Sequence, residues 1–239
     1  IAALPVGQGD CTVVEFPTHE VFVIDGGGDW LGNKDPAKDI VIPYLSERRI
    51  DHLDVVVLSH PHPDHLLGLL TLLDAMPVTE LWSSGYDDTD PLMARLLRLA
   101  REKGTRLRTT PSLLGTHRYG STLVQVLAPD ADDGTSHFSE FGPNDNSLVV
   151  RFVHAGRSAL WPGDIEGRGE HKLLLNHPDL RSDVVKAPHH GSSTSSTRAF
   201  DAATIAKHVL FSTGQNHQWG FPHSLPVQRW QQIGSILRD

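Results

Sequence analysis

The chain has 239 residues and one cysteine, and its 21 Lys+Arg against 29 Asp+Glu give a formal net charge of −8 at pH 7. This length can bury a substantial core, and a hydrophobic share of 38% indicates a globular chain. The lone Cys11 excludes a disulfide scaffold, no apolar run is long enough to span a membrane, and the acidic balance argues against broad electrostatic adhesion to nucleic acid.

The first half of the chain predicts strands followed by helices. β-branched and apolar runs predict strands at 11–16, 20–25 and 53–59. Helical spacing of apolar residues predicts helices at 36–49, 66–75 and 90–103. The strand at 53–59 is almost entirely apolar, which is typical of a strand buried on both faces, and Asp90 before a proline is typical of a helix N-cap.

The second half continues this alternation. Strands are expected at 121–128, 147–153, 157–163, 183–188 and 207–212. Helices are expected at 165–176 and 225–237. This order favours an α/β layered fold with helices outside two sheets. No linker or repeat interrupts it, so we expect one domain over 1–239; the start at Ile1, without a methionine or a targeting signal, suggests a domain excised from a larger protein.

The densest group of ligand-type residues directly follows the apolar strand at 53–59. His60 and His62 are two residues apart, so in an extended loop they point the same way and can bind one cation. Asp64 and His65 are then placed to reach a second cation. Imidazole and carboxylate ligands suit Zn²⁺ or Mn²⁺. The competing interpretation is a solvated histidine-rich turn, which we disfavour because four of the six residues are of ligand type.

Three further strand ends carry aspartate or histidine. Asp25 precedes a run of glycines, Asp164 follows the strand at 157–163, and His189 and His190 follow the strand at 183–188. Taken alone, an aspartate in such a turn more often stabilises the turn than serves a functional site. The histidine pair alone is equally consistent with a structural and a functional role. Together with the HPHPDH loop, these strand ends favour one convergent site.

Five segments carry a resemblance to a known family: VGQGD (6–10), IDGGG (24–28), SHPHPDH (59–65), GD (163–164) and APHHGS (187–192). Together they resemble the metallo-β-lactamase superfamily from about residue 4 to the C-terminus. The VGQGD, NDNS (144–147) and HHGS segments narrow the likeness to the hydrolase domain of ComEC-type DNA-uptake channel proteins of competent bacteria. The resemblance implies a four-layered αββα sandwich with a site for two divalent metal ions, Zn²⁺ or Mn²⁺, between the sheet edges.

The resemblance also implies roles for individual residues. The implied metal ligands are His60 and His62 for the first ion, Asp64 and His65 for the second, Asp164 as a bridge, and one histidine of the HHGS pair, preferably His190, completing the second site. Asp64 would also orient the nucleophile, His189 would act as a neighbour of the metal or as proton donor, and Asp25 would support the histidine loop through hydrogen bonds.

Substrate contacts are expected from Ser192, Asn144 and His223. For Ser192 and the two residues after it, an equally good interpretation is an N-cap for the helix near 197–203. Arg95, Arg98 and Arg101 form a candidate basic stripe on the predicted helix 90–103, although a solvated helix face is the more common explanation.

Two departures from the family pattern bear on the metal site. Many members supply a third histidine to the first metal, where this chain has Asn144, Asp145 and Asn146; His137 lies too far upstream to replace it. We therefore expect a more open first site that accepts Mn²⁺, since oxygen ligands favour harder cations. Where related domains often read Gly-His-Pro-His, this chain has Phe221, so a ligand role there is lost or passes to His223.

The expected function is a metal-dependent phosphodiesterase or nuclease acting on DNA during natural transformation, where it would degrade the non-transported strand. The alternatives are hydrolysis of a small phosphodiester, such as a phosphocholine or teichoic-acid ester, and a catalytically weak DNA-handling module. Expected partners are DNA and the membrane-channel portion of the same parent protein, with an extracytoplasmic (periplasmic) location. No nucleotide cofactor is expected, because GxGxxG and P-loop patterns are absent, and no G-x-S-x-G supports a serine triad.

Overall fold

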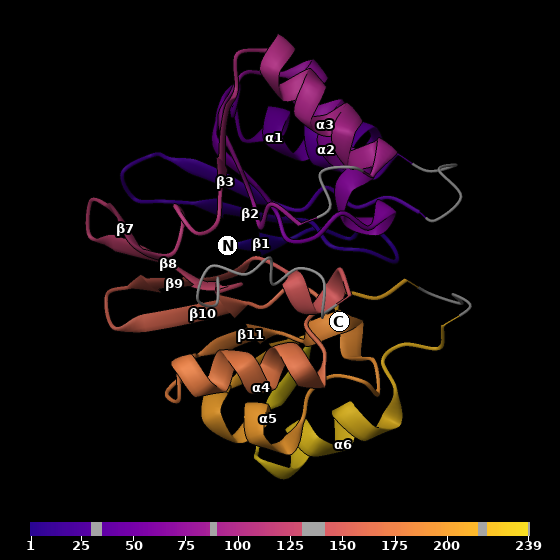
Figure 1. The fold of residues 1–239 in the computed structure, drawn as a ribbon, viewed down its shortest axis with the longest axis vertical. Coiled ribbons are helices and arrows are strands. Elements are labelled where there is room, and N and C mark those ends of the chain that lie inside the picture. The colour runs from indigo at the N-terminus through magenta and orange to yellow at the C-terminus, as the bar shows by residue number, and fades with distance from the viewer. Residues whose placement is uncertain (30–34, 87–89, 131–141, 215–218, 239) are drawn as a thin grey trace. The chain divides into compact units, whose positions relative to one another are not determined.

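The computed structural model describes residues 1–29, 35–86, 90–130, 142–214 and 219–238. The chain forms two compact units, Ile1–Leu113 and Leu114–Asp239, and each unit is built on its own sheet (Figure 1). The α/β class with two sheets is therefore as the sequence predicts, whereas the single domain stays a prediction. Within the described ranges, no helix has the length and apolar character needed to cross a membrane.

The sheet of unit 1 has six strands in sequence order. They are β1 (Ala2–Ala3), β2 (Thr12–Glu15), β3 (Val21–Ile24), β4 (Leu53–Leu58), β5 (Val78–Ser83) and β6 (Arg106–Thr109). The first three run antiparallel, and the pairs from β3 to β6 are parallel. The parallel order places the carboxyl ends of β3 and β4 at the same edge, and loops that follow such ends commonly carry functional side chains.

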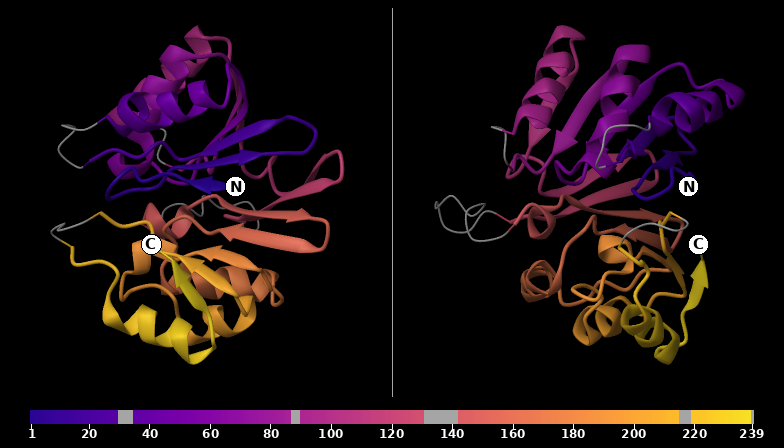
Figure 2. Two further views of the ribbon diagram at one scale, coloured as in Figure 1. Left: turned by 180° about the vertical axis from the view of Figure 1, so that it is seen from behind. Right: turned by 90° about the vertical axis from the view of Figure 1, so that its right-hand side faces the viewer.

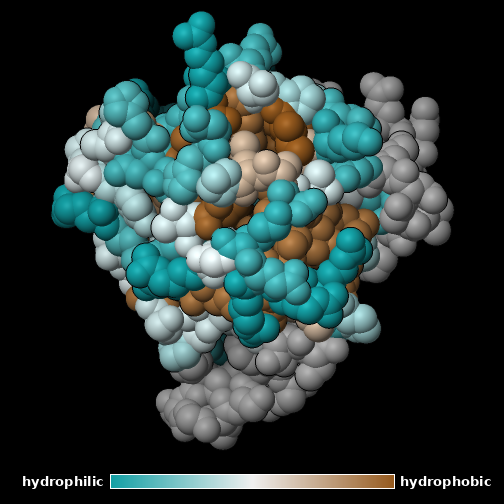
Figure 3. Space-filling model, turned by 90° about the horizontal axis from the view of Figure 1, so that it is seen from above, coloured by the Kyte–Doolittle hydropathy of each residue, from teal (hydrophilic) through white to brown (hydrophobic). Residues whose placement is uncertain are grey.

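Three helices cover unit 1, gathered at one side of its strands in Figures 1 and 2. They are α1 (Ile42–Glu47), which continues a π-helical turn (Ala37–Val41), α2 (Pro63–Ala75) and α3 (Pro91–Glu102). Alternate strand residues such as Val21, Val23 and Val56 share a core with Leu66 and Leu69 of α2. On the surface of this helical side, apolar side chains show between hydrophilic ones (Figure 3).

The sheet of unit 2 has seven strands in the order β13-β12-β11-β10-β9-β8-β7. They are β7 (Gly115–Tyr119), β8 (Thr122–Ala128), β9 (Val149–His154), β10 (Arg157–Trp161), β11 (Val184–Lys186), β12 (His208–Leu210) and β13 (Ile236–Arg238). Strands β7 to β10 are antiparallel, and β10 to β13 are parallel.

In the described part of unit 2, three helices and two 3₁₀ turns accompany this second sheet. They are α4 (Gly167–Asn176), α5 (Arg198–Thr204), α6 (Ser224–Gln232) and the turns η3 (Asn144–Asn146) and η4 (Pro188–Gly191). Leu160 of β10, Leu173 of α4, Phe200 of α5 and Trp230 of α6 are buried in one core. The helices of unit 2 therefore pack through their apolar faces onto its sheet.

The predicted closing helix at 225–237 is wrong over its last turn. Helix α6 ends at Gln232, Gly234 takes a left-handed φ of 84°, and the chain re-enters the sheet as β13 beside β12. Glycine adopts this conformation readily, and it reverses the chain where a helix would have continued. The predicted N-cap of α3 is confirmed, since the side chain of Asp90 accepts hydrogen bonds from the amides of Leu92 and Met93.

Candidate metal centre

The HPHPDH loop is shaped by the start of helix α2. His62 is extended, with φ −70° and ψ 148°, and Pro63 is the first residue of the helix. A proline favours an extended conformation in the residue before it and is well suited to the first helical position. The loop therefore leaves His60 and His62 before the helix and places Asp64 and His65 in its first turn, because α2 begins at Pro63, three residues before the predicted start at 66.

His60 and His62 face each other through one ring nitrogen each. His60 Nε2 lies 3.0 Å from His62 Nδ1. Two nitrogen ligands of a tetrahedral zinc, each about 2.0–2.1 Å from the ion, are roughly 3.3 Å apart. The two rings are thus spaced much as two ligands of one cation would be.

Asp25 holds the histidine loop from the end of β3. It accepts hydrogen bonds from the Ser59 amide and hydroxyl, both at 2.8 Å, and from Nδ1 of His65 at 2.9 Å. Because Nδ1 of His65 carries the proton in this contact, Nε2 keeps its lone pair, which lies 3.8 Å from Asp64 Oδ2. Burial raises the pKa of Asp25, and the neighbouring His65 counters that shift. Asp25 makes the supporting contacts that the family resemblance implies.

Ser59 extends this support to His60. Its hydroxyl donates to Asp25, so its oxygen accepts from Nδ1 of His60, 3.1 Å away. Nε2 of His60 is then the nitrogen with a lone pair. A histidine that donates through one nitrogen and keeps the other for a metal is the usual arrangement in metalloproteins.

Asp10 is a residue of unit 1 that sequence reasoning missed. It is buried, its Oδ2 lies 3.8 Å from His65 Nδ1, and each of the two residues offers a ligand atom within 4.8 Å of the other. Gly9 allows this approach, because a Cβ there would lie 2.3 Å from the carbonyl oxygen of Asp64. The signal in the sequence was the glycine directly before an aspartate in VGQGD.

In unit 2, three buried side chains meet around Asp164. Lys186 Nζ donates to Asp164 Oδ1 at 2.8 Å and to the Gly163 carbonyl at 3.1 Å, and His190 Nε2 lies 3.2 Å from Asp164 Oδ2. Ser147 accepts a hydrogen bond from the Asp164 amide at 3.1 Å. Lys186 was not singled out from the sequence, although a lysine inside an apolar strand pattern is itself a signal.

The structure distinguishes the two histidines of the HHGS segment. Nδ1 of His190 donates to the Ser212 carbonyl at 2.8 Å, which places Nε2 on the side of Asp164. Nδ1 of His189 instead contacts Glu166 Oε1 at 3.1 Å. Both residues have a left-handed backbone, with φ of 48° and 53°, which is uncommon outside glycine and often marks a functional site. This geometry favours His190 as a metal ligand and turns His189 away toward Glu166.

The NDNS segment shapes the start of α4. Asp145 Oδ1 accepts from the amides of Glu166 at 2.7 Å and Gly169 at 2.9 Å, and Asn144 Nδ2 donates to Glu166 Oε1 at 3.1 Å. The Asp145 carboxylate, in the segment where the family resemblance implies a third histidine, is thus engaged with the backbone. The contact of Asn144 with substrate stays a prediction.

The other expected substrate residues lie near η4. Ser192 Oγ contacts Thr194 Oγ1 at 2.9 Å, whereas the N-cap of α5 is Thr197, so the capping interpretation of the serines is wrong. His223 is engaged at both ring nitrogens: Nδ1 accepts from the Ser193 amide at 2.8 Å, and Nε2 donates to the Trp219 carbonyl at 3.2 Å. This supports a structural role for His223; its role in binding substrate stays a prediction.

Phe221 lies beside both histidines of the HHGS segment. The ring of Phe221, which stands where relatives have a histidine, lies 5.6 Å from the ring of His189 and 6.1 Å from that of His190. It therefore packs against both without offering a ligand atom. His137 and His217 lie outside the described residues.

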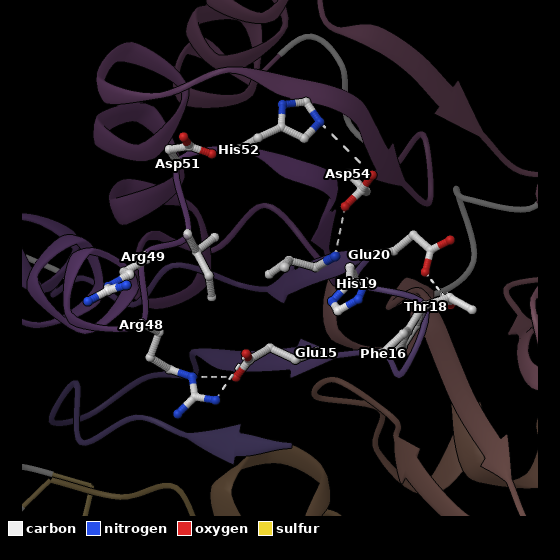
Figure 4. Close-up of a pocket in the computed structure, with 12 residues that line it drawn as sticks. Glu15, Phe16, Thr18, His19, Glu20, Arg48, Arg49, Asp51, His52 and Asp54 are labelled. Atoms are coloured by element: carbon white, nitrogen blue, oxygen red, sulfur yellow. Dashed lines mark hydrogen bonds and ion pairs between the residues drawn. The ribbon is translucent and has the colours of Figure 1, made fainter.

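A large open depression in unit 1 lies away from these residues (Figure 4). Its volume is about 570 Å³, and it is lined by residues at the starts of β3 and β4, whereas the HPHPDH loop follows the end of β4. Among its charged groups, Arg48 contacts Glu15 at 2.6 Å. Within the described ranges, no group of metal-ligand side chains lies there.

The donor set of both units fits divalent metal ions. It consists of imidazole nitrogens and carboxylate oxygens, and His60, His65 and His190 each have the second ring nitrogen directed to a hydroxyl, a carboxylate or a carbonyl. Imidazole and carboxylate together suit zinc, manganese and iron rather than calcium or magnesium. The expected ligands therefore have the chemistry and the supporting contacts that such ions need.

Comparison with known proteins agrees with this chemistry. The chain matches the metallo-beta-lactamase superfamily over residues 4–214. It is 28% identical to ComE operon protein 3 of Bacillus subtilis over 95% of this chain and 30% of that protein. It is 25% identical to Recombination protein 2 of Haemophilus influenzae over 100% of this chain and 27% of that protein. Competence protein ComA of Neisseria gonorrhoeae is 25% identical over 76% of this chain and 23% of that protein.

The chain spans less than a third of the length of each of these three relatives. Among solved structures, the metallo-beta-lactamase fold protein YhfI from Bacillus subtilis aligns with a TM-score of 0.60 at 11% identity, over 99% of this chain and 95% of that one. CmlA from Streptomyces venezuelae aligns with a TM-score of 0.62 at 16% identity, over 99% of this chain and 52% of that one. The chain belongs to the metallo-β-lactamase superfamily and, within it, resembles a domain of the competence proteins.

Proposed function

We propose that this chain is a metal-dependent phosphodiesterase that cleaves DNA. The observation that carries the proposal is the fixed orientation of its histidines: Asp25 holds Nδ1 of His65 at 2.9 Å, and Ser212 holds Nδ1 of His190 at 2.8 Å. In each histidine this contact makes Nε2 the ring nitrogen that a cation would bind. The superfamily consists of metal-dependent hydrolases, and relatives named for competence and recombination support DNA as the substrate.

Two divalent cations, Zn²⁺ or Mn²⁺, are the proposed cofactors. The residues that would hold them are His60, His62, Asp64, His65, Asp164 and His190. When bound, such ions lower the pKa of water and neutralise charge on a phosphate. The preset tautomers of the histidines reduce the ordering that binding requires.

The remaining residues of the site have proposed roles toward the substrate. Asp64 would orient the attacking water, and Asp25 would keep the histidine loop in place. His189 would supply a proton to the leaving oxygen. Ser192, Asn144 and His223 would contact the phosphate or its neighbours.

The biological setting is also a proposal. We propose that the domain degrades the non-transported strand during DNA uptake, outside the cytoplasm, next to the membrane-channel part of its parent protein. The supporting fact is that the relatives named for competence are more than three times as long as the part that this chain matches.

The test compares single-stranded DNA with a phosphocholine diester, using the parent chain and Asp64→Ala. The matched control is Asp74→Ala, because Asp74 lies on the same helix with a side chain that is 72% exposed. We expect the parent and the control to cut DNA, EDTA to stop cleavage, and Asp64→Ala to be inactive. Turnover of the small diester alone would overturn the nuclease function in favour of a small-molecule phosphodiesterase, and metal-bound protein that cuts neither would indicate a DNA-handling module.

A further inference from the structure

We infer that Glu166 positions His189 for proton transfer, an inference that rests on the proposed function. Glu166 lies at the start of α4, and its Oε1 is 3.1 Å from Nδ1 of His189 in η4. No motif in the sequence assigned a role to this glutamate. The contact makes a carboxylate–imidazole pair that is separate from the pair formed by Asp25 and His65 in unit 1.

The carboxylate of Glu166 is itself held in place. Asn144 Nδ2 donates to the same Oε1 at 3.1 Å, and the Glu166 amide is fixed by Asp145 Oδ1 at 2.7 Å. Asn144 and Asp145 both belong to the NDNS segment. This segment, for which the sequence suggested a metal-ligand or substrate role, thus supports the residue that contacts His189.

His189 is restrained on several sides. Thr194 Oγ1 lies 3.4 Å from Nδ1, and the ring of Phe221 stands edge-on at 5.6 Å. The left-handed backbone of His189 turns its side chain from that of His190, although the two residues are adjacent. Its side chain is 21% exposed, whereas that of His190 is 1% exposed. His189 is therefore the member of the pair that a substrate can reach.

This geometry defines which ring nitrogen of His189 exchanges a proton with the substrate. With the proton on Nδ1 donated to Glu166, ring orientation is set and Nε2 is the atom left to exchange a proton with the substrate. In the step, a water oxygen forms a bond to phosphorus and the bond from phosphorus to the leaving oxygen breaks. The leaving oxygen takes the Nε2 proton of the doubly protonated His189 ring, and solvent, which receives the proton released by the water, returns one to Nε2.

The test uses two phosphodiester substrates whose leaving groups differ in their need for a proton donor. Cleavage of a dinucleotide releases a nucleoside alkoxide, which needs the proton. Cleavage of the p-nitrophenyl ester of a nucleotide releases p-nitrophenolate, which is stable without one. For Glu166→Ala, we expect kcat on the dinucleotide to fall on the order of 10- to 100-fold with KM unchanged, and kcat on the nitrophenyl ester to fall less than about threefold. Glu166→Gln keeps an acceptor for Nδ1–H and should recover much of the loss.

Two measurements do not depend on turnover. Nitrogen NMR of the metal-free protein, at a pH high enough for the His189 ring to be neutral, should show the Nδ1–H tautomer in the parent and in Glu166→Gln, and a mixture of tautomers in Glu166→Ala. Metal content should be equal in all three. The matched control is Glu102→Gln, on an exposed side chain of α3, which should change nothing.

The outcomes separate this inference from the proposed function. Equal loss of kcat on both substrates, or an unchanged His189 tautomer in Glu166→Ala, would overturn the positioning role while the nuclease function stood. A parent protein that hydrolyses neither phosphodiester would overturn the proposed function and the proton transfer with it. The tautomer measurement would then still decide whether Glu166 sets the protonated nitrogen of His189.

Discussion

Lys186 and Asp164 form a buried ion pair in which the ammonium contacts Oδ1 of the carboxylate at 2.8 Å and both side chains are 3% exposed. Lys186 leaves Oδ2 on the side of His190, 3.2 Å from Nε2. One carboxylate oxygen is thus neutralised by the protein, while the other faces a histidine whose lone pair suits a metal. In the metal-free protein the lysine is the fixed cation beside Asp164.

Lys186→Met should destabilise the metal-free protein by about 3–5 kcal/mol, since it leaves Asp164 as a buried carboxylate without its cation. Saturating Mn²⁺ should reduce this deficit, because a bound cation would compensate the same charge. Chemical denaturation with and without metal measures both effects. Lys207→Met is the matched control: Lys207 contacts Asp183 at 2.8 Å but is 63% exposed, so its loss should cost less than about 1 kcal/mol. An equal deficit in loaded and metal-free Lys186→Met would argue against Asp164 as a ligand.

Metal preference should follow from the missing third histidine. The Asp145 carboxylate at the matching place accepts two backbone amides through Oδ1, so it does not replace the imidazole. With oxygen ligands in place of a third imidazole, Mn²⁺ should support turnover at least as well as Zn²⁺, since oxygen ligands favour harder cations. Titration of chelated protein with each ion measures this. Activity with Zn²⁺ alone, at tight stoichiometry, would contradict the prediction.

Local sequence pattern was enough to predict that the HPHPDH loop joins a strand to a helix. An apolar strand, two prolines and a helical apolar run fix where β4 ends and α2 begins, within a few residues. For Asp10 and Lys186 the local signals, a preceding glycine and a lysine in an apolar strand, did not identify the partners, because their contacts join segments far apart in sequence. For the same reason, nothing local linked Glu166 to His189, and the strand β13 was hidden in a helical pattern broken at Gly234.

Gly68 should be intolerant of any side chain. A Cβ there would lie 2.0 Å from the Gly26 carbonyl oxygen and 3.1 Å from the Ala37 Cβ, so α2 would have to move from the loop after β3. Gly68→Ala should cost about 1–3 kcal/mol by overpacking and weaken metal binding, because α2 carries Asp64 and His65. Unfolding and metal titration measure these effects. Gly142→Ala, with nothing within 4 Å of its Cβ, should be neutral, and a neutral Gly68→Ala would contradict the close approach.

Asp201 should make the stability of the protein fall as pH rises. It is buried in α5, and in the described part of the chain neither carboxylate oxygen has a hydrogen-bond partner. Burial, and then the charge of Glu170, raise the pKa of Asp201 to about 8 from an ordinary value near 3.8, while Arg229 opposes the shift. The protonated form therefore contributes stability that is complete below about pH 4 and is lost as pH rises toward 8.

Asp201→Asn should remove this dependence. Relative to the parent, the variant should gain on the order of 3 kcal/mol at pH 8 and little at pH 4, by denaturant unfolding at each pH. Asp74→Asn is the control, because contact with Lys103 lowers the pKa of Asp74, so this variant should gain nothing on going from pH 4 to pH 8. Parallel stability curves for the parent and Asp201→Asn would show that Asp201 is ionised in the folded state.

DNA binding by this chain should depend only weakly on salt. The net charge of −8 repels DNA at long range, so affinity would come from bound cations and a few local basic groups. Each phosphate contacted contributes roughly 0.9 to the slope of log affinity against log salt concentration, and about two contacts would give a slope near −2. The candidate stripe of Arg95, Arg98 and Arg101 is exposed on α3, and Arg98 lies 4.0 Å from Glu102. Replacing all three by Gln should leave the slope unchanged, as measured by fluorescence anisotropy with a single-stranded oligonucleotide. A slope that is shallower by about two in the triple variant would show instead that this helix face contacts DNA.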